Sequence, residues 1–181
     1  MNESTQQTTG KNTEEIVANE LSKKGLVAFK PVPDRGIDLV AHFPGDPENL
    51  INIQIKGRGA VQKNKRYRWF QLRTTKAQRE RALKAGLGAE NAWKNKVEKC
   101  DFFVLVSKKH EEKWVFNKKE IYEIISYNKQ VYGNRTDNKE GKQVEMDLDI
   151  EVNGRPLTSL FEKNCNNFGP IVEALRAQRS N

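Results

Sequence analysis

The strictest pattern in the chain is a run of six residues in which isoleucine alternates with a polar side chain. The apolar positions are Ile51, Ile53 and Ile55. Successive side chains of a β-strand point to opposite faces, so the isoleucines share one face and the polar side chains share the other. Residues 50–56 are therefore predicted to form a strand with one buried face. The polar set consists of Asn52, Gln54 and Lys56.

Turn residues, caps and apolar periodicity predict the elements around this strand. A helix is expected to begin at Asn12 or Thr13, either of which can cap it, and to end at Gly25. The predicted order α-β-β-β-β-α-β-β-α indicates an α/β or α+β fold, with a central mixed sheet flanked by helices. Further strands are expected at residues 26–31, 36–42, 67–72, 101–107 and 113–116, further helices at 74–84, 117–125 and 167–177, and short pieces at 90–98 and 144–150. Thr74 or Thr75 can cap the helix at 74–84. The alternation of Asp147 and Asp149 with apolar residues suggests that they lie on an exposed strand face.

The length of 181 residues suits one domain. We expect residues 1–11 to form a flexible polar tail and residues 12–181 to form the domain. The first residues lack the apolar stretch of a signal peptide, and no apolar run reaches membrane-spanning length. Two cysteines without metal-ligand spacing give no reason to expect an oxidising compartment. A cytoplasmic protein without membrane partners is expected.

A basic segment follows the isoleucine strand. The formal net charge of the chain is +8, and residues 56–84 contain a dense set of cations with Glu80 as their only acidic residue. Such a segment is typical of proteins that hold a phosphate backbone, although a solvated charged surface has the same composition. The predicted DNA-binding residues are Arg58, Lys63, Lys65, Arg66, Arg68, Arg73 and Lys76.

Three side chains suggest chemistry at one end of the predicted sheet. Asp38 lies near the start of its strand, and Gln54 and Lys56 share the polar face of the next. If these strands are neighbours, a carboxylate, an amide oxygen and an ammonium group converge beside the Ile55 carbonyl. Mg²⁺ prefers oxygen ligands and keeps several waters, so Asp38, Gln54 and Ile55 could form an incomplete oxygen shell. Lys56 could then orient or activate a water for attack on a phosphate.

Two segments resemble the PD-(D/E)xK nuclease superfamily, which includes many restriction endonucleases. They are residues 36–41, Gly-Ile-Asp-Leu-Val-Ala, and residues 51–57, Ile-Asn-Ile-Gln-Ile-Lys-Gly. The resemblance implies a restriction-endonuclease-like core and a DNA endonuclease that uses Mg²⁺, with Mn²⁺ as a substitute. It also implies that Glu14 on the first helix, with Glu15 as the alternative, joins the catalytic set of Asp38, Gln54 and Lys56. The chain departs from the family pattern because Gln54 stands where Asp or Glu is usual.

Three functions remain open at this point. The first is a sequence-selective endonuclease of restriction or homing type that cuts double-stranded DNA. The second is a Holliday-junction resolvase with the same chemistry, and the third is a catalytically silent DNA-binding module with the same fold. Because cutting both strands of a duplex normally needs two active sites, a homodimer or tetramer is expected.

Overall fold

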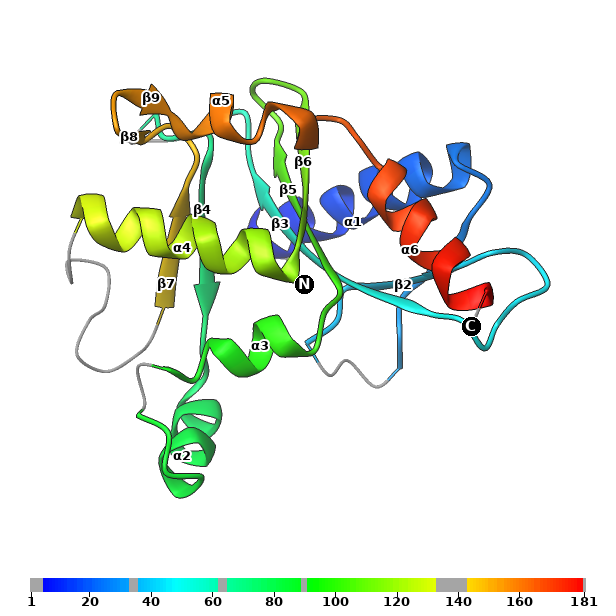
Figure 1. Cartoon of the computed structure of the whole chain (residues 1–181), viewed down its shortest axis with the longest axis horizontal. Helices are drawn as coiled ribbons and strands as arrows, with labels where there is room; N and C mark the ends of the chain where they lie inside the picture. The colour runs from blue at the N-terminus through cyan, green and yellow to red at the C-terminus, as the bar shows by residue number, and fades with distance from the viewer. Residues whose placement is uncertain (1–4, 33–35, 62–64, 89–90, 133–142, 181) are drawn as a thin grey trace.

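A five-stranded mixed sheet forms the centre of the computed structural model, which describes residues 5–32, 36–61, 65–88, 91–132 and 143–180. The strand order is β1-β2-β3-β5-β6, in which β3 and β5 run parallel and the other neighbours run antiparallel. The expected fold class, a mixed sheet flanked by helices, is confirmed (Figure 1). The strands are β1 (Val27–Phe29), β2 (Leu39–His42), β3 (Ile51–Arg58), β5 (Phe102–Ser107) and β6 (Glu112–Asn117).

The isoleucine face of β3 packs against two helices from opposite ends of the chain. Ile51, Ile53 and Ile55 are buried in a core with residues of α1 (Thr5–Lys23) and α6 (Gly169–Arg179). Both helices lie on the same side of the sheet in Figure 1. The alternation in the sequence thus correctly predicted which face of β3 is buried by helices.

The helix α1 begins earlier than the sequence indicates. Its first residue is Thr5, so residues 5–11, expected to be part of a flexible tail, have a helical backbone. Extending an existing helix costs much less than starting one, so the packed turns around Val17 can continue into a polar segment of low apolar periodicity. The expected start at residue 12 or 13 was therefore wrong.

A close contact holds α1 against the end of β3. A Cβ atom added at Gly57 would lie 2.4 Å from Thr13 Oγ1 and 3.0 Å from Thr13 Cγ2. Thr13 is only 1% exposed, so it has little space into which to move. The absence of a side chain at Gly57 is what lets this part of α1 approach the strand that carries Lys56.

The opposite face of the main sheet packs against a separate ribbon and a long helix. The strands β4 (Trp69–Arg73) and β7 (Gln143–Asp147) pair antiparallel to form this two-stranded ribbon. Phe70 and Leu72 point into a core shared with α4 (Lys118–Tyr132). The segment at 67–72 was correctly predicted to be extended, but its strand pairs outside the main sheet.

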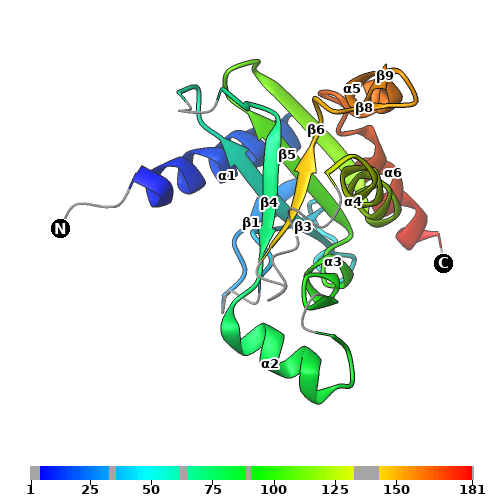
Figure 2. The same cartoon turned by 90° about the vertical axis from the view of Figure 1, so that its left-hand side faces the viewer.

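Two helices lie between β4 and β5 in the chain. Helix α2 (Lys76–Lys84) begins at the predicted cap, where Thr75 and Gln78 form a reciprocal capping box, and α3 (Lys94–Glu98) follows. Both lie at one end of the molecule in Figures 1 and 2, with α2 outermost. None of the helices in the described ranges is long and apolar enough to cross a membrane. The remaining elements are β8 (Glu151–Val152), β9 (Arg155–Pro156), α5 (Leu157–Leu160) and a 3₁₀ turn (Glu162–Asn164).

Candidate active site

The strands β2 and β3 pair only over part of their length, and this creates an open edge. Their register runs from Ala41 opposite Ile51 to Leu39 opposite Ile53. The backbone N–H of Asp38 still donates to the Ile53 carbonyl at 3.0 Å. Beyond that point β3 continues to Arg58 without β2 beside it. The side chain of Asp38 therefore lies where the pairing stops.

The Asp38 carboxylate collects polar groups from three consecutive residues of β3. Its Oδ2 atom accepts a hydrogen bond from the Ile55 backbone N–H at 2.6 Å and another from the Gln54 side-chain amide. Lys56 Nζ lies 3.7 Å from the same oxygen. The structure thus brings together Asp38, Gln54 and Lys56, as the strand pattern predicted.

The Ile55 peptide faces the same edge. The N–H and C=O groups of one residue in an extended strand point to the same side. Because the Ile55 N–H points to Asp38, the Ile55 carbonyl also points to the edge that β2 has left. This carbonyl is the backbone oxygen that the sequence singled out as a third donor.

The donor set suits a hard cation, but it contains a single carboxylate. Gln54 is 2% exposed and donates through Nε2, so its carbonyl oxygen is turned away from Asp38. A half-turn of the terminal amide would exchange these two atoms with little change of shape. The Gln54 oxygen would then lie beside the Asp38 carboxylate, as a second side-chain oxygen available to a cation. The described residues contain no group of three or more Asp, Glu, His or Cys side chains that could bind a metal.

A buried thiol lies behind this centre. Cys100 is fully buried, and its Sγ atom lies 3.8 Å from the Gly36 carbonyl. Burial raises the pKa of the Cys100 thiol to about 12, and the carboxylates of Asp38 and Asp101 act in the same direction. The thiol therefore stays protonated at neutral pH and serves as a packed neutral group, as the sequence suggested.

The structure does not bring Glu14 to the other predicted catalytic residues. Its carboxylate forms an ion pair with Lys30 Nζ at 3.1 Å. The helix that carries Glu14 covers the isoleucine face of β3, whereas Gln54 and Lys56 belong to the opposite face.

Beyond Lys56, the polar face of β3 ends in an aromatic and cationic stack. The guanidinium groups of Arg58 and Arg66 lie over the Trp69 ring, at 4.3 and 4.5 Å from its centroid. Arg58 Nε also donates to the Trp69 carbonyl. Burial lowers the pKa of Arg58, and the nearby charge of Arg66 adds to this effect. This stack fixes β4 against the strand that carries Lys56.

The predicted DNA-binding cations divide into paired and exposed groups. Arg66 forms an ion pair with the buried carboxylate of Asp147, whose strand face was expected to be exposed. Arg68 binds both oxygens of Glu112 at 2.6 and 2.7 Å and Asp149 at 2.9 Å. The exposed group consists of Lys65, Arg73 and Lys76, of which Lys76 also forms an exposed ion pair with Glu80 at 3.8 Å. Lys63 lies outside the described residues.

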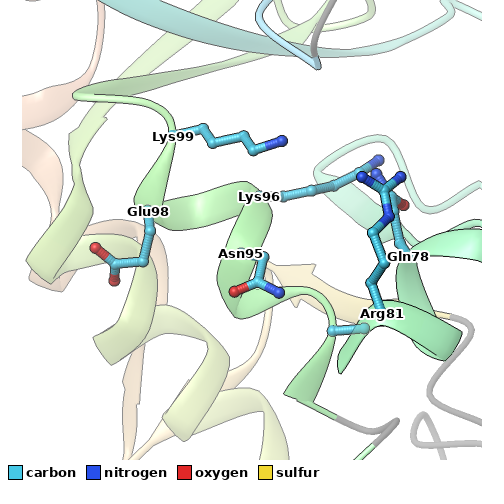
Figure 3. Close-up of a pocket in the computed structure, with 7 residues that line it drawn as sticks. Gln78, Arg81, Asn95, Lys96, Glu98 and Lys99 are labelled. Atoms are coloured by element: carbon cyan, nitrogen blue, oxygen red, sulfur yellow. The ribbon is translucent and has the colours of Figure 1, made fainter. Parts of the chain in front are cut away.

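A pocket of about 400 Å³ lies between α2 and α3. The sequence analysis did not identify it, because its cations come from two short helices whose packing no local pattern reveals. Figure 3 shows Lys96 extending from α3 toward the side chains of α2, while the Glu98 carboxylate points in the other direction. The polar lining consists of Gln78, Arg81, Asn95, Lys96, Glu98 and Lys99.

The fold is similar to that of a solved nuclease. No protein-family model matches the sequence, and a search of curated proteins finds no match. The structure of a bacterial homing endonuclease, I-Ssp6803I, aligns with a TM-score of 0.53 and 18% sequence identity. The alignment covers 98% of this chain and 97% of the other. The likeness extends over nearly both whole chains, and at this identity it shows a shared fold.

Proposed function

We propose that the protein is a Mg²⁺-dependent endonuclease that hydrolyses phosphodiester bonds in double-stranded DNA. The observation that carries the proposal is the convergence of Asp38, Gln54, Lys56 and the Ile55 peptide where β2 leaves β3. The shared fold with a bacterial homing endonuclease supports the assignment, as does the resemblance to PD-(D/E)xK nucleases. By the same likeness we infer sequence-selective cutting of the restriction or homing type.

Each residue of the centre has a role that its chemistry allows. Asp38, the Gln54 amide oxygen and the Ile55 carbonyl would hold Mg²⁺, and Mn²⁺ would substitute. When bound, the cation supplies Lewis-acid stabilisation of the charge that develops on the phosphoryl oxygens. Lys56 Nζ orients the attacking water and neutralises part of that charge. Its ion pair with Asp38 keeps the ammonium group at the open edge.

A catalytically silent DNA-binding module is the second candidate. It is favoured by Gln54, which offers a cation no negative charge and leaves Asp38 as the single carboxylate of the trio. The same fold and basic surface would then serve binding alone. Activity therefore has to be separated from binding in any test.

The deciding experiment compares wild type and Lys56→Ala on a duplex plasmid and on a four-way junction, with Mg²⁺ and with EDTA. Wild type should give discrete plasmid fragments only with Mg²⁺. Lys56→Ala should lose about 100-fold or more in rate but bind DNA normally in EDTA, since its role is in the reaction. The control is Lys119→Ala, which removes an exposed lysine of α4.

Three results would overturn the proposal in different ways. Cutting of the junction alone would identify a resolvase. DNA binding without cutting by wild type in Mg²⁺ or Mn²⁺ would identify the silent module. Cutting by Lys56→Ala at the wild-type rate would remove Lys56 from the active site.

A further inference from the structure

The pocket between α2 and α3 carries an excess of positive charge that none of the residues assigned to cutting explains. Arg81 lines it from α2, Lys96 from α3, and Lys99 from the position directly after α3. The side chains of Asn95 and Lys99 form no hydrogen bond or ion pair with any other described residue. Three cations and two amide groups are a suitable donor set for a phosphate oxygen.

The one acidic residue at the pocket does not neutralise these cations. Glu98 accepts a hydrogen bond from the Tyr122 hydroxyl at 2.6 Å and pairs with Lys118 at 3.4 Å, both on α4. The Tyr122 hydrogen bond lowers the pKa of Glu98. In Figure 3 its carboxylate points away from Lys96 and Arg81. The charge of Glu98 is therefore directed to α4 and away from the interior of the pocket.

The two walls of the pocket are built differently. Wall α3 is fixed to the body, because Trp93 at its start is buried and packs against Tyr122, with ring centroids 5.5 Å apart. Wall α2 projects from the body and buries only Ala82 among its residues. A helix with so little contact to the core adds little to folding stability, and its polar surface is available to a partner.

The pocket is linked to the proposed active site through the start of β5. Lys99, which lines the pocket, directly precedes Cys100, whose Sγ atom contacts the Gly36 carbonyl two residues before Asp38. The next residue, Asp101, accepts a hydrogen bond from the Asn52 backbone N–H on β3 at 2.8 Å. The pocket and Asp38 are thus joined through residues 99–101, which lead from α3 into the main sheet.

We propose that the pocket between α2 and α3 is a second phosphate-binding site, which holds a non-scissile phosphodiester group of the bound DNA. This inference rests on the proposed function. It identifies where the DNA backbone is held away from the point of cutting, and it assigns that role to Arg81 near the end of the basic segment together with Lys96 and Lys99 beyond it. Binding of the backbone at two points would fix the direction in which the duplex crosses the active site.

The test is the salt dependence of binding to a short DNA duplex in EDTA, measured by fluorescence anisotropy. The pocket variant is Arg81→Gln with Lys99→Gln. Its matched control is Lys84→Gln with Lys94→Gln, which removes one exposed cation from each of the same two helices outside the pocket lining. If these two cations hold one backbone phosphate, the slope of log affinity against log salt should fall by about 0.9. The control should change it by less than half as much.

Two outcomes would overturn the inference, and they are distinguishable. Equal slopes in the pocket variant and the control, with wild type that binds and cuts DNA, would overturn the pocket site alone. A wild-type protein that neither binds nor cuts DNA would overturn the proposed function and the pocket site together.

Discussion

At the scale of single residues, Gln54 is the most informative position. Its side chain is buried and hydrogen-bonded to Asp38, so Gln54 does not belong to a solvated strand face. A neutral amide can lie against the Asp38 carboxylate without a cation, whereas two carboxylates would repel each other there. The amide therefore lets the centre fold in the absence of metal.

This argument predicts the behaviour of Gln54→Glu. In EDTA at neutral pH the variant should lose about 1–3 kcal/mol of stability, because a second carboxylate faces Asp38 in a buried position. The repulsion raises the pKa of the pair, so the loss should shrink as the pH falls. Mg²⁺ should raise the melting temperature of this variant more than that of wild type. Thermal melts with and without Mg²⁺ measure both effects.

The control is Gln54→Met, which has a similar length but no oxygen ligand. It should lose the hydrogen bond to Asp38 and gain nothing from Mg²⁺. If Mg²⁺ raises the melting temperature of Gln54→Glu no more than that of wild type, Gln54 does not occupy a metal-ligand position.

At the scale of elements, the seating of α1 on β3 depends on Gly57. Gly57→Ala should lower the free energy of unfolding by about 1–3 kcal/mol, because the new Cβ atom would overlap Thr13. Thr13→Ala removes the two nearest atoms, so the double variant should be less destabilised than the sum of the single variants. Urea unfolding of the four proteins measures this coupling. Strict additivity would mean that α1 does not press on this position.

The paired and the exposed arginines of the basic segment should respond differently to their removal. Arg68→Gln should cost about 1–3 kcal/mol of stability, because it leaves the half-buried Glu112 without its partner, and it should leave the salt dependence of DNA binding unchanged. Arg73→Gln should leave stability unchanged but reduce the salt slope by about 0.9, since Arg73 is exposed and bonds only the neutral Gln71 among the described residues. A smaller slope in Arg68→Gln would contradict the division into paired and exposed cations.

The ion pair between Arg68 and Glu112 should also make the free energy of unfolding depend on pH in the acid range. Burial raises the pKa of Glu112, whereas the hydrogen bonds and charge of Arg68 lower it by a larger amount. The pKa of Glu112 in the folded protein therefore lies below the ordinary glutamate value. The stabilisation should be complete above the ordinary glutamate value of about 4.3 and should be lost as the pH falls through the lowered value. In Arg68→Gln this part of the acid sensitivity should disappear.

Much of this element-scale organisation could be predicted from the sequence. Alternation in residues 51–56 defined β3 and its two faces, and the Thr75 cap defined the start of α2. The pairing of β4 with β7 could not be predicted, because alternation along a strand identifies its buried face but not the strand with which it pairs. The pairing of Arg68 with Glu112 was missed for a similar reason: it joins residues 44 apart in the chain.

At the scale of the whole molecule, the number of active sites decides how DNA is cut. One chain carries one proposed centre, so cutting both strands of a duplex requires a second copy. An equimolar mixture of wild type with Lys56→Ala should contain mixed dimers that cut one strand only. Nicked plasmid should therefore accumulate, measured on agarose gels over time. The same mixture made with Lys119→Ala should yield linear plasmid.

The oligomeric prediction can fail in a clear way. If the chain acts as a monomer, mixing in Lys56→Ala would only halve the rate at which linear plasmid appears, and nicked plasmid would not increase. Sedimentation of the wild-type protein without DNA would then show a single chain.

The arrangement of β3 in the sheet also has a consequence for how the chain folds. The contact between Gln54 and Asp38 spans 16 residues, whereas the bond between Asn52 and Asp101 across β3 and β5 spans 49. Closing a short loop is faster than closing a long one, so the hairpin of β2 and β3 can form before the other edge of β3 pairs with its parallel partner β5. During synthesis on the ribosome, that unpaired edge stays exposed until residues 102–107 emerge. In this interval the nascent chain is most open to wrong strand pairing and aggregation.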